Sequence, residues 1–419
     1  MPVTNRVVVA GLGAAFVAVS TVAPLVLKTT PSDLDLFFWP SAEAAVTGHP
    51  LLIYSAQAHG ISYNDNGPLG LIPLLPAAAL ANALGWAGSL VGRAALTGAI
   101  TSMVVLLLAF QAARYTGSAV GDSRRQRAVV AAVVLAPALW IAILDYGHVE
   151  QPLELCLILL AATWALRERN ALTGLALGAA VLIRTIAGFA AIPLVLAPLA
   201  ARRIRPSAAC VATTIITIGV GLAPFLLADE STTVHALFTY RGGLPIGGGS
   251  FWVIAKDASW AGLIGEGDVY LGAAVATALV AITLLRKPML GTTHLGLMGL
   301  LTIASCCFPL LAKSVFPYYL AEPYVFASIW WLARPGRAIS WRALVPLLLT
   351  VDVFIVKAAL QAPFSTWGAL GGVASSAVLA GAVTLVMFDL LRSPVAVDAS
   401  QPLGRRLLHH ELPAIQKAK

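Results

Sequence analysis

Apolar runs of roughly 17–25 residues recur from one end of this chain to the other, separated by short charged stretches. That is the length a helix needs to cross the ~30 Å hydrocarbon core of a bilayer. Only 11% of the 419 residues are charged, whereas soluble domains carry about 25%. The sequence therefore predicts an all-α polytopic membrane protein and excludes a large soluble enzyme.

The runs predict about twelve membrane-spanning helices in a single domain over residues 1–392, followed by a cytoplasmic tail at 393–419. The first run has no clear cleavage site after it, so we interpret it as a spanning helix and not a signal peptide. The expected spans are residues 7–27, 90–114, 128–144, 151–167, 171–184, 186–201, 207–228, 269–285, 294–312, 315–333, 343–360 and 367–391.

Basic residues orient these spans. With the N-terminus in the cytoplasm, 20 of the 27 Lys and Arg residues fall on the cytoplasmic side and 7 outside, as the positive-inside rule requires. The net charge of +8 therefore reflects topology, and no nucleic-acid partner is expected. We expect a multi-pass protein of the cell membrane with both termini in the cytoplasm and the active site on the outer face.

Two long outer segments are predicted, at residues 28–89 and 229–268. Within the first, the stretch Pro68–Leu84 is apolar but contains three prolines. Counting it as a span would move the basic stretch Gly121–Arg127 outside. We therefore expect a juxtamembrane helix that lies at the outer face.

Familiar soluble-enzyme motifs are absent. The chain has no Walker loop, no GxSxG elbow and no HExxH. Its four cysteines lie inside apolar segments without metal-ligand spacing. No cofactor is expected; a divalent cation near Asp33 and Asp35 is compatible with the sequence but not required.

The two aspartates Asp33 and Asp35 follow the first span and precede an aromatic run. One interpretation is a solvated acidic loop; the other is a catalytic or ion-binding carboxylate. In an extended chain both side chains would point the same way, whereas a short helix would separate them. Partial burial by the neighbouring aromatics would raise a carboxylate's pKa and make it a better base near neutral pH.

Polar side chains also gather further along the first outer segment, at Tyr63, Asn64 and Asp65 in "YNDNGP". An ordinary polar turn explains each of them singly, but their number favours a substrate-binding loop.

The next outer turn, "DYGHVEQPLEL", is short and crowded with His148, Glu150 and Gln151. Glu154 follows inside the next span, where an acid is costly unless it faces a cavity or a partner. We expect this turn to line a site, the alternative being an interfacial cap.

Three basic residues from separate segments reach the same outer level: Arg184, Arg241 and Lys313, the last followed by Tyr318 and Tyr319. Snorkelling to the interface would explain Arg184. The other interpretation is a phosphate site, because a guanidinium matches phosphate oxygens in a bidentate manner. Together with the carboxylates of the first outer segment, these cations predict a phosphate-bearing ligand at the outer face.

Three stretches resemble polytopic GT-C glycosyltransferases that use polyprenyl-phosphate sugars. The closest resemblance is to the bacterial mannosyltransferases of phosphatidylinositol-mannoside and lipoglycan synthesis. The stretches are "DLDLFFWPSAEAAVTGHPLLIY" with "YNDNGPLGLIPLLP", then His148–Leu196, and "KSVFPYYLAEP".

The resemblance implies a GT-C-like fold and transfer of a sugar, mannose in the first instance, to a hydroxyl of a lipid or glycan acceptor. It also implies inversion, with Asp35 as general base and Asp33 as second choice. Arg184 and Lys313, with His148, would stabilise the departing polyprenyl phosphate.

A transporter or flippase of a lipid-linked or anionic substrate is the alternative function. It would place charges near the middle of the membrane, where the sequence offers chiefly Glu154 and Asp352. The transferase places them at one face.

Overall fold

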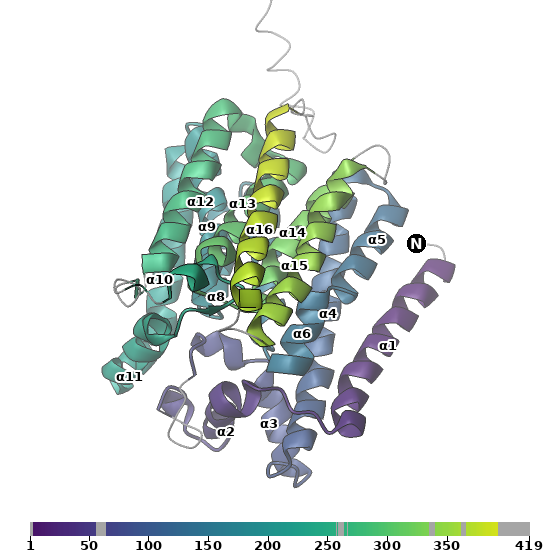
Figure 1. Ribbon diagram of the computed structural model, residues 1–419, viewed down its shortest axis with the longest axis vertical. Helices are drawn as coiled ribbons and strands as arrows, with labels where there is room; N and C mark the ends of the chain where they lie inside the picture. Colours follow the sequence, from purple (N-terminus) through teal and green to yellow (C-terminus); the bar gives the residue numbers. More distant parts are fainter. Residues whose placement is uncertain are drawn as a thin grey trace, which may run out of the picture.

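A computed structural model describes residues 3–55, 64–256, 258, 264–265, 267–334, 340–361 and 366–392, with side chains from residue 10 onward. These residues are almost entirely helical (Figure 1). The helices are α1 Val3–Leu27, α2 Trp39–Val46, α3 Leu74–Ala83, α4 Leu90–Val120, α5 Ser123–Val134, α6 Pro137–Ile141, α7 Glu150–Leu166, α8 Asn170–Val181, α9 Gly188–Ala200, α10 Ile204–Ala228, α11 Glu230–Val234, α12 Gly267–Arg286, α13 His294–Leu311, α14 Ala321–Leu332, α15 Leu344–Gln361 and α16 Thr366–Arg392; the strands are β1 Gly247–Gly248 and β2 Ser314–Val315.

Eight helical segments in the described part of the chain are long and apolar enough to cross a membrane, which confirms the prediction of an all-α polytopic membrane protein. Each of the twelve expected spans coincides with a helix. Not all are long enough to cross alone: α8 has 12 residues and α9 has 13, or about 18–20 Å at 1.5 Å per residue. The count of twelve crossings therefore remains a prediction.

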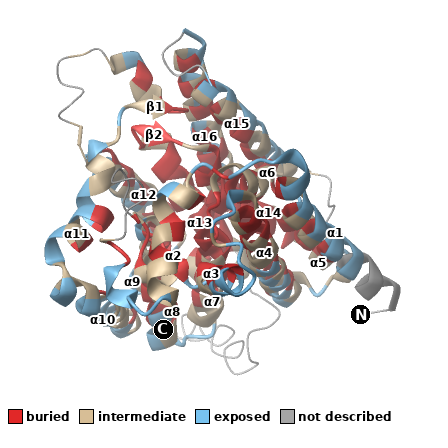
Figure 2. Ribbon diagram, turned by 90° about the horizontal axis from the view of Figure 1, so that it is seen from below, coloured by how far each residue is buried: buried red, intermediate tan, exposed pale blue. Residues whose placement is uncertain are grey.

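The long helices form one bundle, and α2, α3 and α11 lie beyond one end of it (Figure 1). In the centre of the bundle is α13, of whose apolar window 72% is buried, whereas only 11% of that of α10 is. Figure 2 shows the same contrast, with the buried residues concentrated around α13 and α14. The helix α10 therefore presents most of its surface to lipid.

Small residues allow α8 to pack closely against α10. A Cβ added to Gly174 would lie 2.3 Å from the Cys210 carbonyl oxygen, and one added to Gly178 would lie 2.6 Å from Thr217 Cβ. The two glycines are four residues apart and so share one face of α8, the arrangement that brings membrane helices into backbone contact. This contact fixes the C-terminal end of α8, where Arg184 follows.

The first outer segment folds back over the end of the bundle. After α1 the chain makes one wide helical turn, Leu34–Phe38, and continues into α2. Phe38 and Trp39 are buried in an apolar cluster that also contains residues of α3 and Leu222 of α10. The stretch predicted to lie at the membrane surface forms a 3-10 turn and the ten-residue α3, which is too short to cross.

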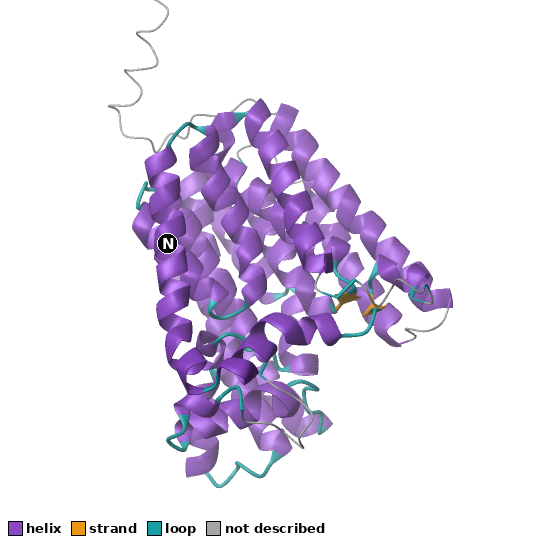
Figure 3. Cartoon of the chain, turned by 90° about the vertical axis from the view of Figure 1, so that its left-hand side faces the viewer, coloured by secondary structure: helices purple, strands orange, loops and turns teal. Residues whose placement is uncertain are grey.

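The second outer segment is attached to the chain after α13 by a two-residue parallel pairing of β1 with β2 (Figure 3). Gly248 has φ +64°, and a Cβ there would lie 2.0 Å from the Val315 carbonyl oxygen. Only glycine allows this approach. The pairing places the turn containing Arg241 beside Lys313.

Candidate functional site

A tight junction brings the chain after α1 against the turn before α7. The Ser32 and Asp33 backbone N–H groups donate to the Asp145 and Tyr146 carbonyl oxygens at 2.8 and 3.1 Å. Gly147 ends the preceding helical turn with φ 79°, and a Cβ there would lie 2.8 Å from Leu34 Cβ. A residue with a side chain would separate the two segments, so this glycine keeps Asp33 next to His148.

Asp33, His148 and Glu150 form a hydrogen-bonded chain. His148 Nε2 lies 3.2 Å from Asp33 Oδ2, and His148 Nδ1 lies 2.5 Å from Glu150 Oε1. Burial alone would lower the His148 pKa, but the Glu150 carboxylate and the hydrogen bond to Asp33 outweigh it and raise that pKa to about 9. The imidazole is therefore a cation at neutral pH, held between two carboxylates.

Burial opposes ionisation of Glu150, but the positive charges of His148 and Arg184 outweigh it and lower the Glu150 pKa. Arg184 Nε lies 3.6 Å from Glu150 Oε1. The hydrogen-bonded chain of Asp33, His148 and Glu150 is thus joined, through Glu150, to the ion pairs of Arg184.

Arg184 occupies the break between α8 and α9 and contacts three acids. Besides Glu150, its Nη1 donates to Glu322 Oε1 at 2.8 Å and to Glu154 Oε2 at 3.3 Å. Gln151 Nε2 donates to the same Glu322 oxygen at 2.9 Å. Arg184 is only 5% exposed, so it does not snorkel to the interface, and the carboxylates around it neutralise its charge.

Asp35 lies away from this chain. Because Leu34–Phe38 is helical and not extended, residues two apart point to nearly opposite sides. Asp35 Oδ1 accepts a hydrogen bond at 2.9 Å from Nη1 of Arg93, whose guanidinium stacks over the Trp39 ring. Of the two aspartates, Asp33 is the one that joins His148.

The segment containing Asn64 and Asp65 is attached to the end of α8. Gly67 donates its N–H to the Ile183 carbonyl at 3.0 Å, and a Cβ on Gly67 would lie 1.9 Å from the Leu182 carbonyl oxygen. Asn64 is fully buried and accepts a hydrogen bond from the Asn66 N–H. Tyr63, also expected at this site, lies outside the described residues.

Asp65 belongs to this attached segment and lies near the charged side chains of His148 and Arg184. Burial raises its pKa to about 6; the nearby His148 and Arg184 charges lower it, and the Glu150 and Asp33 charges raise it. Its Oδ1 atom is buried and has no hydrogen-bond partner among the described residues.

Arg241 and Lys313 are linked through the Asp268 carboxylate, and Arg241 also contacts Tyr319. Arg241 Nη1 donates to the Tyr319 hydroxyl at 3.1 Å, and its Nη2 lies 3.4 Å from Asp268 Oδ2. That carboxylate oxygen also accepts the Lys313 backbone N–H at 2.7 Å, while Lys313 Nζ donates to the Gly242 carbonyl. Lys313 thus holds the turn that presents Arg241.

Tyr318 and Tyr319 join the two groups of charges. The Tyr318 carbonyl oxygen accepts a 2.5 Å hydrogen bond from Gln151, and its ring lies 4.0 Å from the His148 ring. Arg184 lies 5.9 Å from the centres of both tyrosine rings. The structure therefore brings together every described residue of the expected site except Asp35.

A cavity of about 430 Å³ opens beside this cluster. Its walls are mostly apolar and come from α9, α12 and the turn after α11. Its polar lining includes Asp65, Asn66, Arg184, Tyr240, Arg241 and Tyr319. The cavity thus combines two guanidinium groups and one carboxylate with a wall suited to an alkyl chain.

Glu154, Glu322 and Asp268 belong to this site although we did not include them among its expected residues. Each is an acid within or at the start of an apolar helix, and an acid in that position needs a partner. A charged residue in an apolar helix was therefore the feature of the sequence that could have identified them. Arg93, the partner of Asp35, is an isolated basic residue in the first turn of α4.

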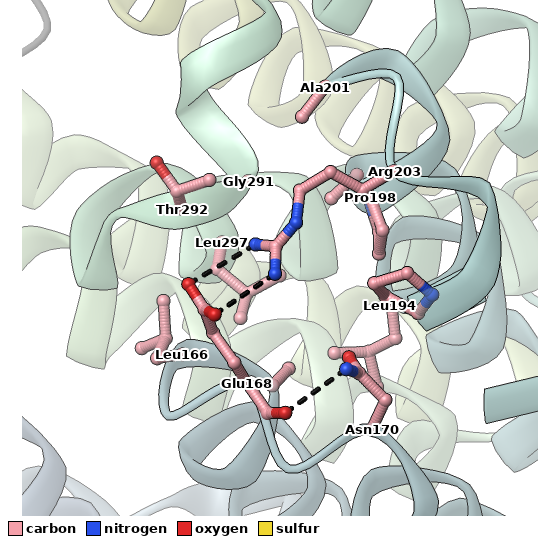
Figure 4. A pocket seen from close by; sticks show the side chains of 13 residues that line it. Leu166, Glu168, Asn170, Leu194, Pro198, Ala201, Arg203, Gly291, Thr292 and Leu297 are labelled. Carbon is pink, nitrogen blue, oxygen red and sulfur yellow. Dashed lines mark hydrogen bonds and ion pairs between the residues drawn. The ribbon is translucent and has the colours of Figure 1, made fainter. Parts of the chain in front are cut away.

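A second pocket among the described residues differs in character from the large cavity. The described residues contain no group of three or more His, Cys, Asp or Glu arranged to hold a metal ion. At the opposite end of the bundle, the pocket in Figure 4 is lined by Glu168, paired with Arg203 at 3.0 and 3.2 Å, and by apolar side chains. The ion pair in that pocket is partly exposed and has one acid for one base. Beside the large cavity, in contrast, the acids are buried and outnumber the basic groups they contact.

The chain matches no model of a known protein family, and no curated protein matches it.

Proposed function

We propose that this protein is a membrane glycosyltransferase that moves a sugar from a polyprenyl-phosphate donor to a hydroxyl of a lipid or glycan acceptor at the outer face, with inversion. Mannose is the sugar that the resemblance to GT-C mannosyltransferases favours. The supporting observation is the cavity whose lining combines Arg184 and Arg241 with apolar side chains of the helices α9 and α12.

The cavity suits the two parts of such a donor. The prenyl chain would lie along the apolar walls of α9 and α12, and the phosphate would meet a guanidinium. Arg241 has the more favourable charge balance, because among the described residues it pairs with one carboxylate, that of Asp268, whereas three carboxylates surround Arg184. Arg241 is therefore proposed as the first phosphate ligand, with Arg184 second and Lys313 acting through the turn it holds.

The reaction needs one base and one stabilised leaving group. A carboxylate of the first outer segment would take the proton of the acceptor hydroxyl as its oxygen attacks the anomeric carbon. The bond from that carbon to the phosphate oxygen breaks, and its electron pair leaves with the polyprenyl phosphate. Fixed positive charges next to the phosphate lower the barrier because they need no reorganisation.

A flippase for a lipid-linked anionic substrate is the second candidate. In favour of it, Asp352 is fully buried in α15 and neither of its carboxylate oxygens has a hydrogen-bond partner among the described residues. An intramembrane acid of this kind is a common feature of transport paths. Against it, the other buried acids of the site gather at one end of the bundle.

Purified protein, radiolabelled polyprenyl-phosphate mannose and membrane acceptor lipids give the direct test. Formation of a labelled acceptor that depends on the protein supports the transferase. In a parallel experiment, the same donor is placed in proteoliposomes and its movement between leaflets is measured. Movement without transfer would replace the transferase with the flippase.

A further inference from the structure

The first outer segment contains three aspartates, and the structure gives each a different environment. Asp35 is held by Arg93, and Asp33 by the cationic His148. Neither of them lines the large cavity. Asp65 does, and it is the single carboxylate among the described residues of its lining.

We propose that Asp65, and not Asp35 or Asp33, takes the proton of the acceptor hydroxyl. This inference rests on the proposed transferase function and names the base of that reaction. Asp65 lines the same cavity as Arg184 and Arg241, the groups proposed to hold the donor phosphate. The proposed base and the proposed phosphate site therefore open into one cavity, where a bound acceptor and a bound donor can meet.

Hydrogen bonding separates the three candidates further. A carboxylate oxygen that already accepts a hydrogen bond from a cationic side chain is occupied, and so is less available to take a proton from a substrate hydroxyl. Asp35 accepts from an arginine and Asp33 from a protonated histidine. Asp65 Oδ1 accepts no hydrogen bond from any described residue, so it has capacity for a substrate proton.

The electrostatic surroundings support the same assignment. Burial together with the charges of Glu150 and Asp33 raises the Asp65 pKa to about 6, against the lowering effect of His148 and Arg184. A base with a pKa near the working pH combines an ionised resting state with a useful affinity for the proton. Within the chain from Asp33 through His148 to Glu150, the two carboxylates raise the Asp65 pKa and the His148 cation lowers it.

The step is balanced as follows. The acceptor oxygen forms a bond to the anomeric carbon, and its proton moves to the Asp65 carboxylate. The carbon–oxygen bond to the phosphate breaks, and the electron pair leaves on polyprenyl phosphate. Asp65 returns its proton to water once the product has left.

The test compares Asp65→Asn with wild type in the transfer assay with polyprenyl-phosphate mannose, and uses Glu230→Gln in α11 as an exposed acid from the same end of the bundle. We expect Asp65→Asn to lower kcat about 10²–10⁴-fold while donor binding is kept, and Glu230→Gln to leave the rate unchanged. The wild-type rate should decline below about pH 6, the pKa to which Asp65 is raised.

If wild type transfers sugar and Asp65→Asn keeps at least a third of its rate, this assignment is overturned and the proposed function stands. A wild type that transfers no sugar overturns both. A second measurement, made on the wild-type protein, tests the assignment even if Asp65→Asn does not fold. In the wild-type protein, dicyclohexylcarbodiimide should modify Asp65 below pH 6, as read by peptide mass spectrometry, and polyprenyl phosphate should protect it. Absence of that modification also overturns the assignment.

Discussion

The two ends of the helix bundle contain similar charged residues in different arrangements. At the inner end, as assigned by the distribution of basic residues, Asp389 is bound by Arg334 and Arg342, and Glu168 pairs with Arg203. There, basic groups equal or outnumber the acids they contact. At the outer end, five acids surround two cations: Asp33, Asp65, Glu150, Glu154 and Glu322 around His148 and Arg184.

Burial makes the difference consequential. The Glu168 and Arg203 side chains are 38% and 35% exposed, whereas those of Glu150 and Arg184 are 1% and 6% exposed. An exposed ion pair contributes little because water screens it, but a buried charge depends on every partner it has. Matched pairs at the inner end hold helix ends in place. Burying more acidic than basic side chains beside a cavity destabilises the fold, so stability does not explain this arrangement. We therefore interpret the outer end as the functional one.

The largest effect should come from removing the central cation of the outer end. Arg184→Gln leaves Glu150, Glu154 and Glu322 buried without their shared partner, which should cost about 3–5 kcal/mol. Arg203→Gln at the inner end should cost less than about 1 kcal/mol. Thermal unfolding of both variants in the same detergent measures the contrast, and equal losses would mean that the two ends do not differ as described.

A steric substitution at the outer end should come next. Gly67→Ala places a Cβ 1.9 Å from the Leu182 carbonyl oxygen, so the segment carrying Asp65 must move. Overpacking of this kind costs about 1–3 kcal/mol, and the displacement of Asp65 should also lower transfer activity. The matched control is Gly219→Ala in α10, where an added Cβ meets nothing within 4 Å. If both variants unfold and react alike, the attachment of this segment to α8 is not important.

Protonation of His148 should make the stability of the outer end depend on pH. Its pKa rises from 6.5 unfolded to about 9 folded, so the folded state binds this proton more tightly. The resulting stabilisation is complete below about pH 6.5 and disappears as the pH rises through 9.

The melting temperature of the wild type should therefore fall across that window, and that of His148→Gln should fall less. A variant with an unchanged slope would show that other groups cause the pH dependence.

The smallest effect is expected at an exposed pair that nevertheless belongs to the outer end. Lys357 Nζ lies 2.6 Å from Asp145 Oδ2, but the two side chains are 42% and 40% exposed. Lys357→Gln should change stability by less than about 1 kcal/mol, and less still at high salt. A larger loss in denaturation measurements would indicate that position in the bundle matters more than burial.

Much of the architecture follows from the sequence alone. The spacing of apolar runs predicted a helix at every position where the structure has a long one, because the bilayer requires each crossing to satisfy its own backbone hydrogen bonds. The unusual Arg184 identified the break between α8 and α9. His148, Glu150, Asn64 and Asp65 were recognisable as polar residues between apolar helices, and burying such groups is costly without a function or a partner.

Tertiary structure alone decided which of these residues meet. Asp33 and Asp35 are only two residues apart in the sequence, yet one helical turn sends them to different partners, since residues two apart on a helix point nearly opposite ways. The neutralisation of Arg184 by Glu322 joins positions 138 residues apart, and no local pattern predicts such a contact. The location of Asp65 in the cavity depends on Gly67 approaching the backbone of Leu182. The sequence thus determines which polar and charged groups the fold must bury, and long-range packing determines which of them faces the cavity.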